Sequence, residues 1–285
     1  MKKIGKTYNW WTVLGLGTIV VLGMDTGCPP TIPPFDPGTV KPGKLPRNVS
    51  KLVIFAKKRL VLGRANGFHR LYHTDALVAL DKARSLDPTN LEVLLLGAEV
   101  SRRLGERARS GPKQFKYAEL GLGFTRAGRK AFPKRVEFHY YHAALTGLRV
   151  DAYRASAFSG VPEINAACTQ AIKLDKRFDH AGPLRVLGSL LASVPATAPF
   201  HGDIEKGTAL LEQATKLDPD FPLNHYFLAQ AYAKDDENAK AARHYHRVIC
   251  APQSADWDPV IAAKYRGLTQ KALRALKQSD SPKCR

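Results

Sequence analysis

The chain has 285 residues, a mass of 31.4 kDa and a formal net charge of +19, from 44 Lys and Arg against 25 Asp and Glu. A hydrophobic content of 44% excludes global disorder, and four cysteines are too few for a disulfide-built scaffold. Only one apolar run approaches membrane length, which excludes a polytopic membrane protein. The charge favours nucleic acid, anionic lipid or an acidic protein as partner, without choosing among them.

The first 27 residues have the polarity of an export leader. Three lysines precede an apolar stretch at 10–24, which as a helix spans about 22 Å, less than the roughly 30 Å of a hydrocarbon core. Gly27 before Cys28 resembles a bacterial lipoprotein cleavage box, although Asp25 stands where that pattern has an aliphatic residue. The resemblance implies that Cys28 is lipidated. An uncleaved short anchor and ordinary secretion are the alternatives.

Residues 28–47 are predicted to form a tether. The segment 29–46 contains seven prolines and two glycines, so it propagates neither a helix nor a sheet ladder and behaves as a stiff, extended spacer. Such a spacer would hold a folded body away from a membrane. The alternative is a disordered tail without a role.

The body, residues 48–285, is predicted to be all-α. Apolar residues recur at helical spacing, with almost no alternation of period two. The segment 204–217 carries its apolar residues on one face, with Asp203 ahead as the expected N-cap and Pro219 as the stop. A second helix is predicted over 90–104 by the same spacing.

The body also repeats internally. Three segments share Ala, two further residues and Leu-Asp: KARSLDPTN at 82–90, QAIKLDKRF at 170–178 and QATKLDPDF at 213–221, with weaker copies at 127–135 and 246–254. Their stop positions are Pro88, Pro133, Lys176, Pro219 and Pro252, separated by 45, 43, 43 and 33 residues. A period of this size indicates one helical hairpin per repeat, stacked in an array.

These positions resemble the tetratricopeptide (TPR) repeat. The small–bulky–small–proline pattern of its second helix is matched by Ala76, Leu80, Ala83 and Pro88, and by Gly207, Leu211, Ala214 and Pro219. Its first helix is matched by Leu96-Gly97-Val100, Leu187-Gly188-Leu191 and Leu228-Ala229-Tyr232. The resemblance implies a solenoid of about ten helices. Because most periods exceed 34 residues, we expect insertions near 105–112, 159–162 and 195–202.

A closer resemblance covers about 180–235. Arg185-Val186-Leu187-Gly188, Pro195, Gly202-Asp203 and Leu217-Asp218-Pro219 match, in order, the T-component (TatT) lipoproteins associated with TRAP transporters. The resemblance implies a periplasm-facing, membrane-tethered protein of the bacterial cell envelope that oligomerises and docks a periplasmic solute-binding protein. It also implies that the protein is not an enzyme.

Catalytic and metal motifs are not found. There is no phosphate-binding glycine loop, nucleophile elbow or paired-carboxylate motif. His69 with His73, and His139 with His142, could each share a helix face, but two ligands do not make a metal site. We therefore expect no cofactor and no metal, and an enzyme with a histidine-based site is the lowest alternative.

Candidate binding residues come from a basic window and from an aromatic run. Residues 101–135 hold 11 Lys and Arg against two Glu, which favours an acidic partner or an anionic surface. Aromatic anchors at 138–141 could line a groove or pack between hairpins. Arg185 is added from the closer resemblance, and His201 is added because it lies in the Pro/Gly loop before Asp203. The candidates are Arg102, Arg103, Arg126, Arg129, Lys130, Phe138, Tyr140, Tyr141, Arg185 and His201.

The cysteines of the body divide by repeat register. Cys168 and Cys250 occupy positions taken by Leu in other repeats, so both are expected to pack as small hydrophobes. A bridge between Cys250 and Cys284 is the alternative for that pair in an oxidising compartment.

The sequence therefore predicts an exported, tethered helical-repeat scaffold that binds a protein partner through a groove. A carrier of a small or lipid-like ligand in an aromatic and basic pocket is the alternative. Nucleic acid is not expected, because an exported protein rarely meets it. The sequence is also compatible with a homo-oligomer.

Overall fold

The computed structural model describes residues 45–67, 69–108, 111–252, 257, 259–277 and 284. The predicted leader, Cys28 and nearly all of the predicted tether lie outside these residues. Within them the chain forms helices and no strand. The α-helices are α1 (Val49–Ala65), α2 (Arg70–Leu86), α3 (Leu91–Glu106), α4 (Gly111–Ala131), α5 (Val136–Ala152), α6 (Ala157–Asp175), α7 (Phe178–Ser193), α8 (Ile204–Leu217), α9 (Pro222–Lys234), α10 (Asn238–Cys250) and α11 (Pro259–Ala275).

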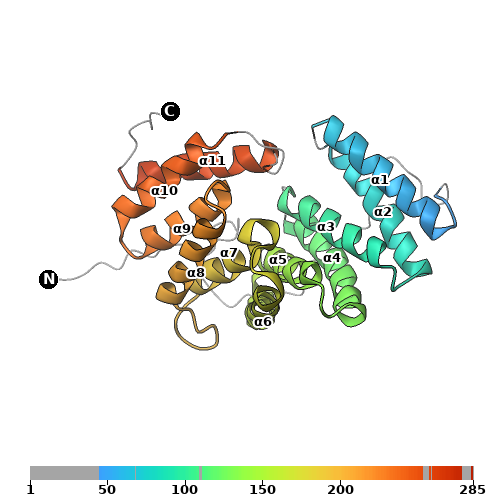
Figure 1. Ribbon diagram of the computed structural model, residues 1–285, viewed down its shortest axis with the longest axis horizontal. Coiled ribbons are helices and arrows are strands. Elements are labelled where there is room, and N and C mark those ends of the chain that lie inside the picture. The colour runs from blue at the N-terminus through green and yellow to red at the C-terminus, as the bar shows by residue number, and fades with distance from the viewer. Residues whose placement is uncertain are drawn as a thin grey trace.

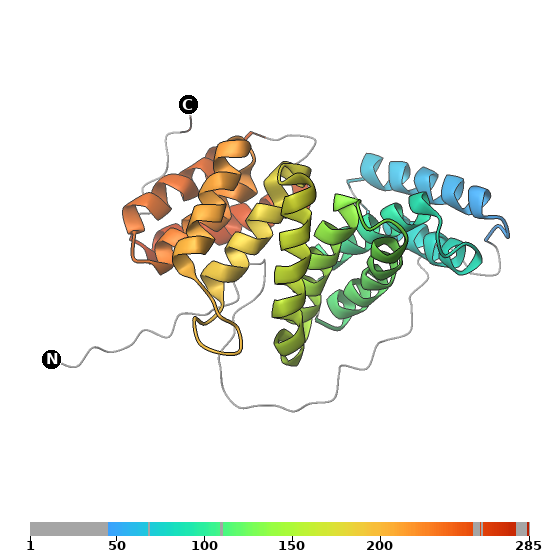
Figure 2. The same cartoon turned by 60° about the horizontal axis from the view of Figure 1, so that its bottom comes forward.

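The helices pack as consecutive hairpins, which confirms the predicted all-α solenoid. α1 pairs with α2, α3 with α4, α5 with α6, α7 with α8, and α9 with α10. The first helices of neighbouring hairpins also contact one another, from α3 to α5, α7 and α9, and α11 adds a last contact with α9. Figure 1 shows the hairpins following an arc, with α11 extending back toward α3, and Figure 2 shows the same order from a second side.

Helix ends follow local capping chemistry. Asp203 accepts a hydrogen bond from the Lys206 backbone N–H at 2.9 Å and caps α8, as predicted. Asn48 caps α1 and Asn90 caps α3 in the same way. Each cap pairs one backbone N–H that the first helical turn cannot satisfy. The caps therefore set where these helices begin.

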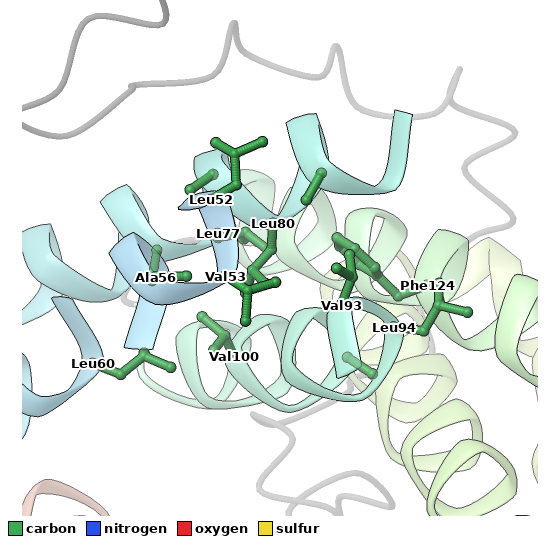
Figure 3. Packing of buried hydrophobic residues seen from close by; sticks show 14 of the residues in the cluster. Leu52, Val53, Ala56, Leu60, Leu77, Leu80, Val93, Leu94, Val100 and Phe124 are labelled. Carbon is green, nitrogen blue, oxygen red and sulfur yellow. The ribbon is translucent and has the colours of Figure 1, made fainter. Parts of the chain in front are cut away.

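The residues that carry the repeat pattern lie in the core, as predicted. Leu80 and Leu211 are fully buried, and so is the free thiol of Cys168. Figure 3 shows Leu80 among the side chains that join the first two hairpins. A Cβ on Gly207 would lie 2.7 Å from the Gly188 carbonyl oxygen, so the repeat glycines permit an approach of α7 and α8 that alanine would block.

The expected insertion site at 195–202 lies in the connection between α7 and α8. The expected site at 105–112 overlaps the end of α3 and the start of α4, and the expected site at 159–162 is wrong, because it lies inside α6. The connection there is earlier, at 153–156. Gly160 is needed for packing rather than for a break, because a Cβ would overlap a methyl of Val150 on α5. Pro162 lies near the start of α6 and interrupts few helical hydrogen bonds.

The C-terminal end is covalently closed. Cys250 and Cys284 form a disulfide, with their Cα atoms 5.2 Å apart. The alternative of a disulfide bridge is therefore confirmed for Cys250, in place of packing as a small hydrophobic side chain. The bridge connects the chain after α11 to the last residue of α10. Among the described residues, no helix combines the length and the hydropathy that a membrane crossing requires.

Candidate functional site

A cavity of about 250 Å³ lies between the first helices of successive hairpins. Its walls come from α3, α5, α7, α9 and α11, with Gln114 from α4 and Trp257 just before α11. These helices are far apart in sequence and meet because the array curves until α11 closes one side. Concave sites between helices are the usual place for a ligand in a helical protein.

A left-handed turn projects two side chains into this cavity. Asp179, His180 and Ala181, near the start of α7, have φ values of 49°, 58° and 59°. Each such non-glycine residue costs roughly 1–2 kcal/mol, so three in succession need support from the surroundings. Asp179 and His180 both line the cavity. Strained backbone of this kind concentrates at functional sites.

Arg185 supplies that support. The residue is 5% exposed, and its guanidinium donates to the carbonyl oxygens of His180 at 2.9 Å and Asp179 at 3.3 Å. It also donates to the side-chain oxygen of Asn224 at 2.9 Å and lies over the Phe221 ring. The planar guanidinium of arginine presents five donors in a fixed geometry, which suits acceptors that lie in several directions. Arg185 thus holds α7 against α9.

Asp179 is a charged group in a largely buried setting. Burial would raise its pKa, but the nearby guanidinium groups of Arg102 and Arg185 outweigh burial and lower it. The Tyr140 hydroxyl donates a hydrogen bond to the Asp179 carboxylate. Burial, and then the Asp179 charge, raises the pKa of Tyr140 well above its usual value. The tyrosine therefore stays protonated and the aspartate stays ionised.

The last turn of α3 carries a cluster of cations. Arg102 pairs with Glu106 at 2.5 Å, and Arg103 pairs with Glu99 at 2.8 Å. Arg107 follows directly, and its pKa falls to about 10 because of burial and of repulsion from Arg103 and Arg102. With three arginines against Glu99 and Glu106, this end of the cavity carries a net positive charge.

His180 is oriented by its neighbours. Its ring stacks on Phe221, with centroids 4.1 Å apart, and its Nδ1 lies 2.5 Å from a carboxylate oxygen of Asp218. Asn224 is fully buried and donates to the backbone carbonyl of Asp218 at 3.1 Å. The end of α8 and the start of α9 therefore fix the cavity-facing ring.

The structure brings part of the predicted set together. Arg102, Arg103, Tyr140 and Arg185 line the cavity. Tyr141 lies behind it, with the Arg102 guanidinium 5.7 Å from its ring centre. Phe138 is fully buried between helices, beside Phe132 and Gly128.

The remaining candidates lie elsewhere. Arg126, Arg129 and Lys130 are on α4 and do not line the cavity. His201 is exposed in the loop between α7 and α8. Cys28 lies outside the described residues. The basic window thus separates into a part that faces the cavity and a part on α4 that does not.

Sequence reasoning missed the residues that the last helix and the strained turn contribute. These are Asp179, His180, Trp257, Lys264 and Tyr265. Nothing in the repeat register marks α11, which follows the last recognisable hairpin. Phe178 and Pro183 flank the turn and indicate an irregular start of α7, but they do not show where it points.

Among the described residues, no group of three or more His, Cys, Asp or Glu lies close enough together to hold a metal ion.

Comparison with known proteins supports the fold. No protein-family model matches the chain, and no curated protein matches it. A crystal structure of TTC0263, a thermophilic TPR protein of Thermus thermophilus, is similar to it. The alignment covers 80% of this chain and all of that chain, with a TM-score of 0.55 and 16% identity. The chain therefore has a TPR-like fold.

Proposed function

We propose that this protein is a non-enzymatic scaffold of the bacterial cell envelope that binds a protein partner through the concave side of its helical array. One observation carries the proposal. Five helices from different parts of the chain form one hollow surface, and its lining holds five cations, Arg102, Arg103, Arg107, Arg185 and Lys264, against two carboxylates, Glu106 and Asp179. A preformed, positively charged concavity favours an acidic segment of a partner.

Tethering and export belong to the same proposal. The lysine-rich start, the apolar stretch and Gly27-Cys28 support a lipid anchor, and the proline-rich segment supports a spacer. The disulfide between Cys250 and Cys284 agrees with an oxidising compartment such as the periplasm. The partner that this proposal favours is a periplasmic solute-binding protein of a TRAP-type uptake system.

The partner proposal is tested by affinity purification of the full-length, tagged protein from solubilised membranes. We expect a protein partner to be recovered, and recovery to fall as salt rises. Charge reversal at Arg103 and Lys264 to Glu should reduce recovery several-fold. Arg126→Glu and Lys130→Glu on α4 are the matched controls and should not. Loss of recovery with the control pair alone would place the partner outside the groove.

The anchor is tested separately with Cys28→Ala. If Cys28 carries the lipid, this variant should move from the membrane fraction to the soluble fraction. Unchanged membrane association would contradict a lipid anchor and favour an uncleaved N-terminal helix.

A second candidate function is a carrier of a small ligand. The observation that favours it is the lining of the cavity, where aromatic side chains, among them Tyr140, Phe227 and Tyr265, stand next to the arginines. Such a mixture of apolar walls and a few charged groups is typical of small-molecule sites.

A further inference from the structure

We propose that the cavity binds a small organic acid, a free carboxylate joined to an aromatic or branched aliphatic body. The carboxylate lies at the α3 and α11 end, and the apolar body lies against the wall formed by α9 and α11. This inference rests on the carrier function above and not on partner binding.

The net charge of the side chains that line the cavity favours an anionic ligand. Glu106 engages Arg102 at 2.5 Å, and Asp179 lies 3.5 Å from Arg185. Arg103 pairs at 2.8 Å with Glu99, which lies outside the lining. With Arg107 and Lys264, the lining holds more positive charge than these carboxylates carry. The lowered pKa of Arg107 agrees with an excess of positive charge, which a bound carboxylate would relieve.

The apolar wall is rigid. Tyr265 packs edge-to-face on Tyr226 at a centroid distance of 4.7 Å and on Phe227 at 6.0 Å. Trp257 is buried, and the Arg266 guanidinium lies 4.8 Å from its ring centre. Because these rings are held by their neighbours, little side-chain freedom is lost when a ligand packs against them.

The size of the cavity limits the ligand. A cavity of about 150 Å³ holds benzene in an engineered protein, so 250 Å³ suits a ring or branched chain with one carboxylate. Guanidinium groups pair well with either carboxylate or phosphate. A phosphate dianion is more costly to desolvate beside apolar walls, so the lining favours the singly charged carboxylate.

The test is isothermal titration calorimetry of the full-length protein in detergent with four probes. Phenylacetate and 4-methylvalerate present a carboxylate on an aromatic and on a branched body. Phenethylamine reverses the charge, and inorganic phosphate removes the body. We expect saturable binding of at least one carboxylate, no binding of the amine, and phosphate at least tenfold weaker. Equal binding of the amine, or binding of neither carboxylate, would overturn the proposal.

Matched variants locate the site. Lys264→Gln and Arg103→Gln should each weaken carboxylate binding about tenfold, the effect of losing one charge-assisted hydrogen bond. Lys130→Gln and Arg126→Gln remove the same charges from α4 and should leave the affinity unchanged. Equal effects of both pairs would indicate general electrostatics and contradict a built site.

A filling variant tests the cavity without changing charge. Ala144 lines the cavity and is partly exposed, so Ala144→Phe places a ring in the ligand's space. Binding should be lost while helical content and melting temperature are retained. Retained affinity would overturn the proposal. Partner recovery from membranes is a separate readout, so a failure of either proposal is recognised on its own. A peptide with a free C-terminal carboxylate that binds while both small acids fail would favour the partner proposal instead.

Discussion

At the residue scale, the shape of the cavity depends on the hydrogen bonds that Arg185 makes. Arg185 reaches two carbonyl oxygens of the left-handed turn and the side chain of Asn224, and it lies near the Asp179 carboxylate. These contacts join α7 to α9 and offset the strain of the turn. The residue that was a binding candidate in the sequence thus acts first as a positioning residue.

We therefore expect Arg185→Met to lower the free energy of unfolding by about 3–5 kcal/mol, because it leaves buried acceptors on Asp179, His180 and Asn224 without their donor and removes one of the two guanidinium groups beside the Asp179 carboxylate. Chemical denaturation followed by circular dichroism measures the change. Arg177→Met removes an exposed arginine two residues before the turn and should have little effect. An equal loss in both variants would contradict the supporting role of Arg185.

Two glycines give opposite predictions for the same substitution. Gly128→Ala should destabilise by about 1–3 kcal/mol, because its Cβ would overlap the ring of Phe138. Gly267→Ala on α11 meets nothing within 4 Å and should stabilise by roughly 0.5–1 kcal/mol, because alanine restricts the unfolded helix segment. Thermal melts of the two variants, measured side by side, check both signs.

At the scale of elements, α11 has a special position. It belongs to no hairpin, packs on α9 and α10, and supplies Lys264 and Tyr265 to the cavity. Arg266 donates to the Ala251 carbonyl at 2.6 Å and helps to hold the helix against the end of α10. The Cys250–Cys284 bridge closes a segment with a sequence separation of 34 that contains all of α11.

Reduction of this bridge should loosen α11 before the rest of the array. Closing a loop of this length stabilises by about 3–4 kcal/mol in the chain-entropy model. Cys284→Ser should therefore increase amide hydrogen exchange across α11 while α3–α6 keep their protection. Reductant should act on the wild type and leave the variant unchanged. Uniform loss of protection along the chain would contradict this view of α11 as a separately held element.

At the scale of the whole molecule, buried histidines recur along the array. His73 on α2 and His244 on α10 have their pKa lowered to about 4, mainly by burial, and the pKa of His225 on α9 is lowered for the same reason. His225 Nε2 lies 2.7 Å from the Pro219 carbonyl oxygen, and its Nδ1 lies 2.9 Å from His244 Nδ1. One of the two facing Nδ1 atoms must be the acceptor, so at least one ring must be neutral for this pair to hydrogen-bond, and protonating both rings would break the bond.

The array should therefore lose stability as pH falls from about 6.5 toward 4. A histidine with a lowered folded pKa binds protons more readily when unfolded, so acid favours the unfolded chain. Glu163 acts in the same direction below about 4.5, because the hydrogen bond from His142 lowers its pKa to about 2. Melting temperatures between pH 4 and 8 measure the trend, and His244→Asn should make it shallower. A constant or rising melting temperature on acidification would contradict it.

Local spacing along the chain was sufficient to predict the class of fold and the register of its repeats. The period of the stop positions, the small residues at Ala76 and Gly207, and the burial of Leu80 and Leu211 all follow from it. Helix periodicity identifies buried faces without knowledge of the neighbours, and the cap at Asp203 is equally local.

Which residues share the cavity depends instead on packing across the whole array. The position of α11 follows from how far the array curves, and that curvature sums small packing angles between hairpins. Asp179 and His180 face the cavity because Arg185, Tyr140 and Asn224, from three helices, stabilise a turn that local preferences oppose. Lys264 on α11 follows Asn224 by 40 residues and Tyr140 by 124, separations beyond the reach of any local pattern.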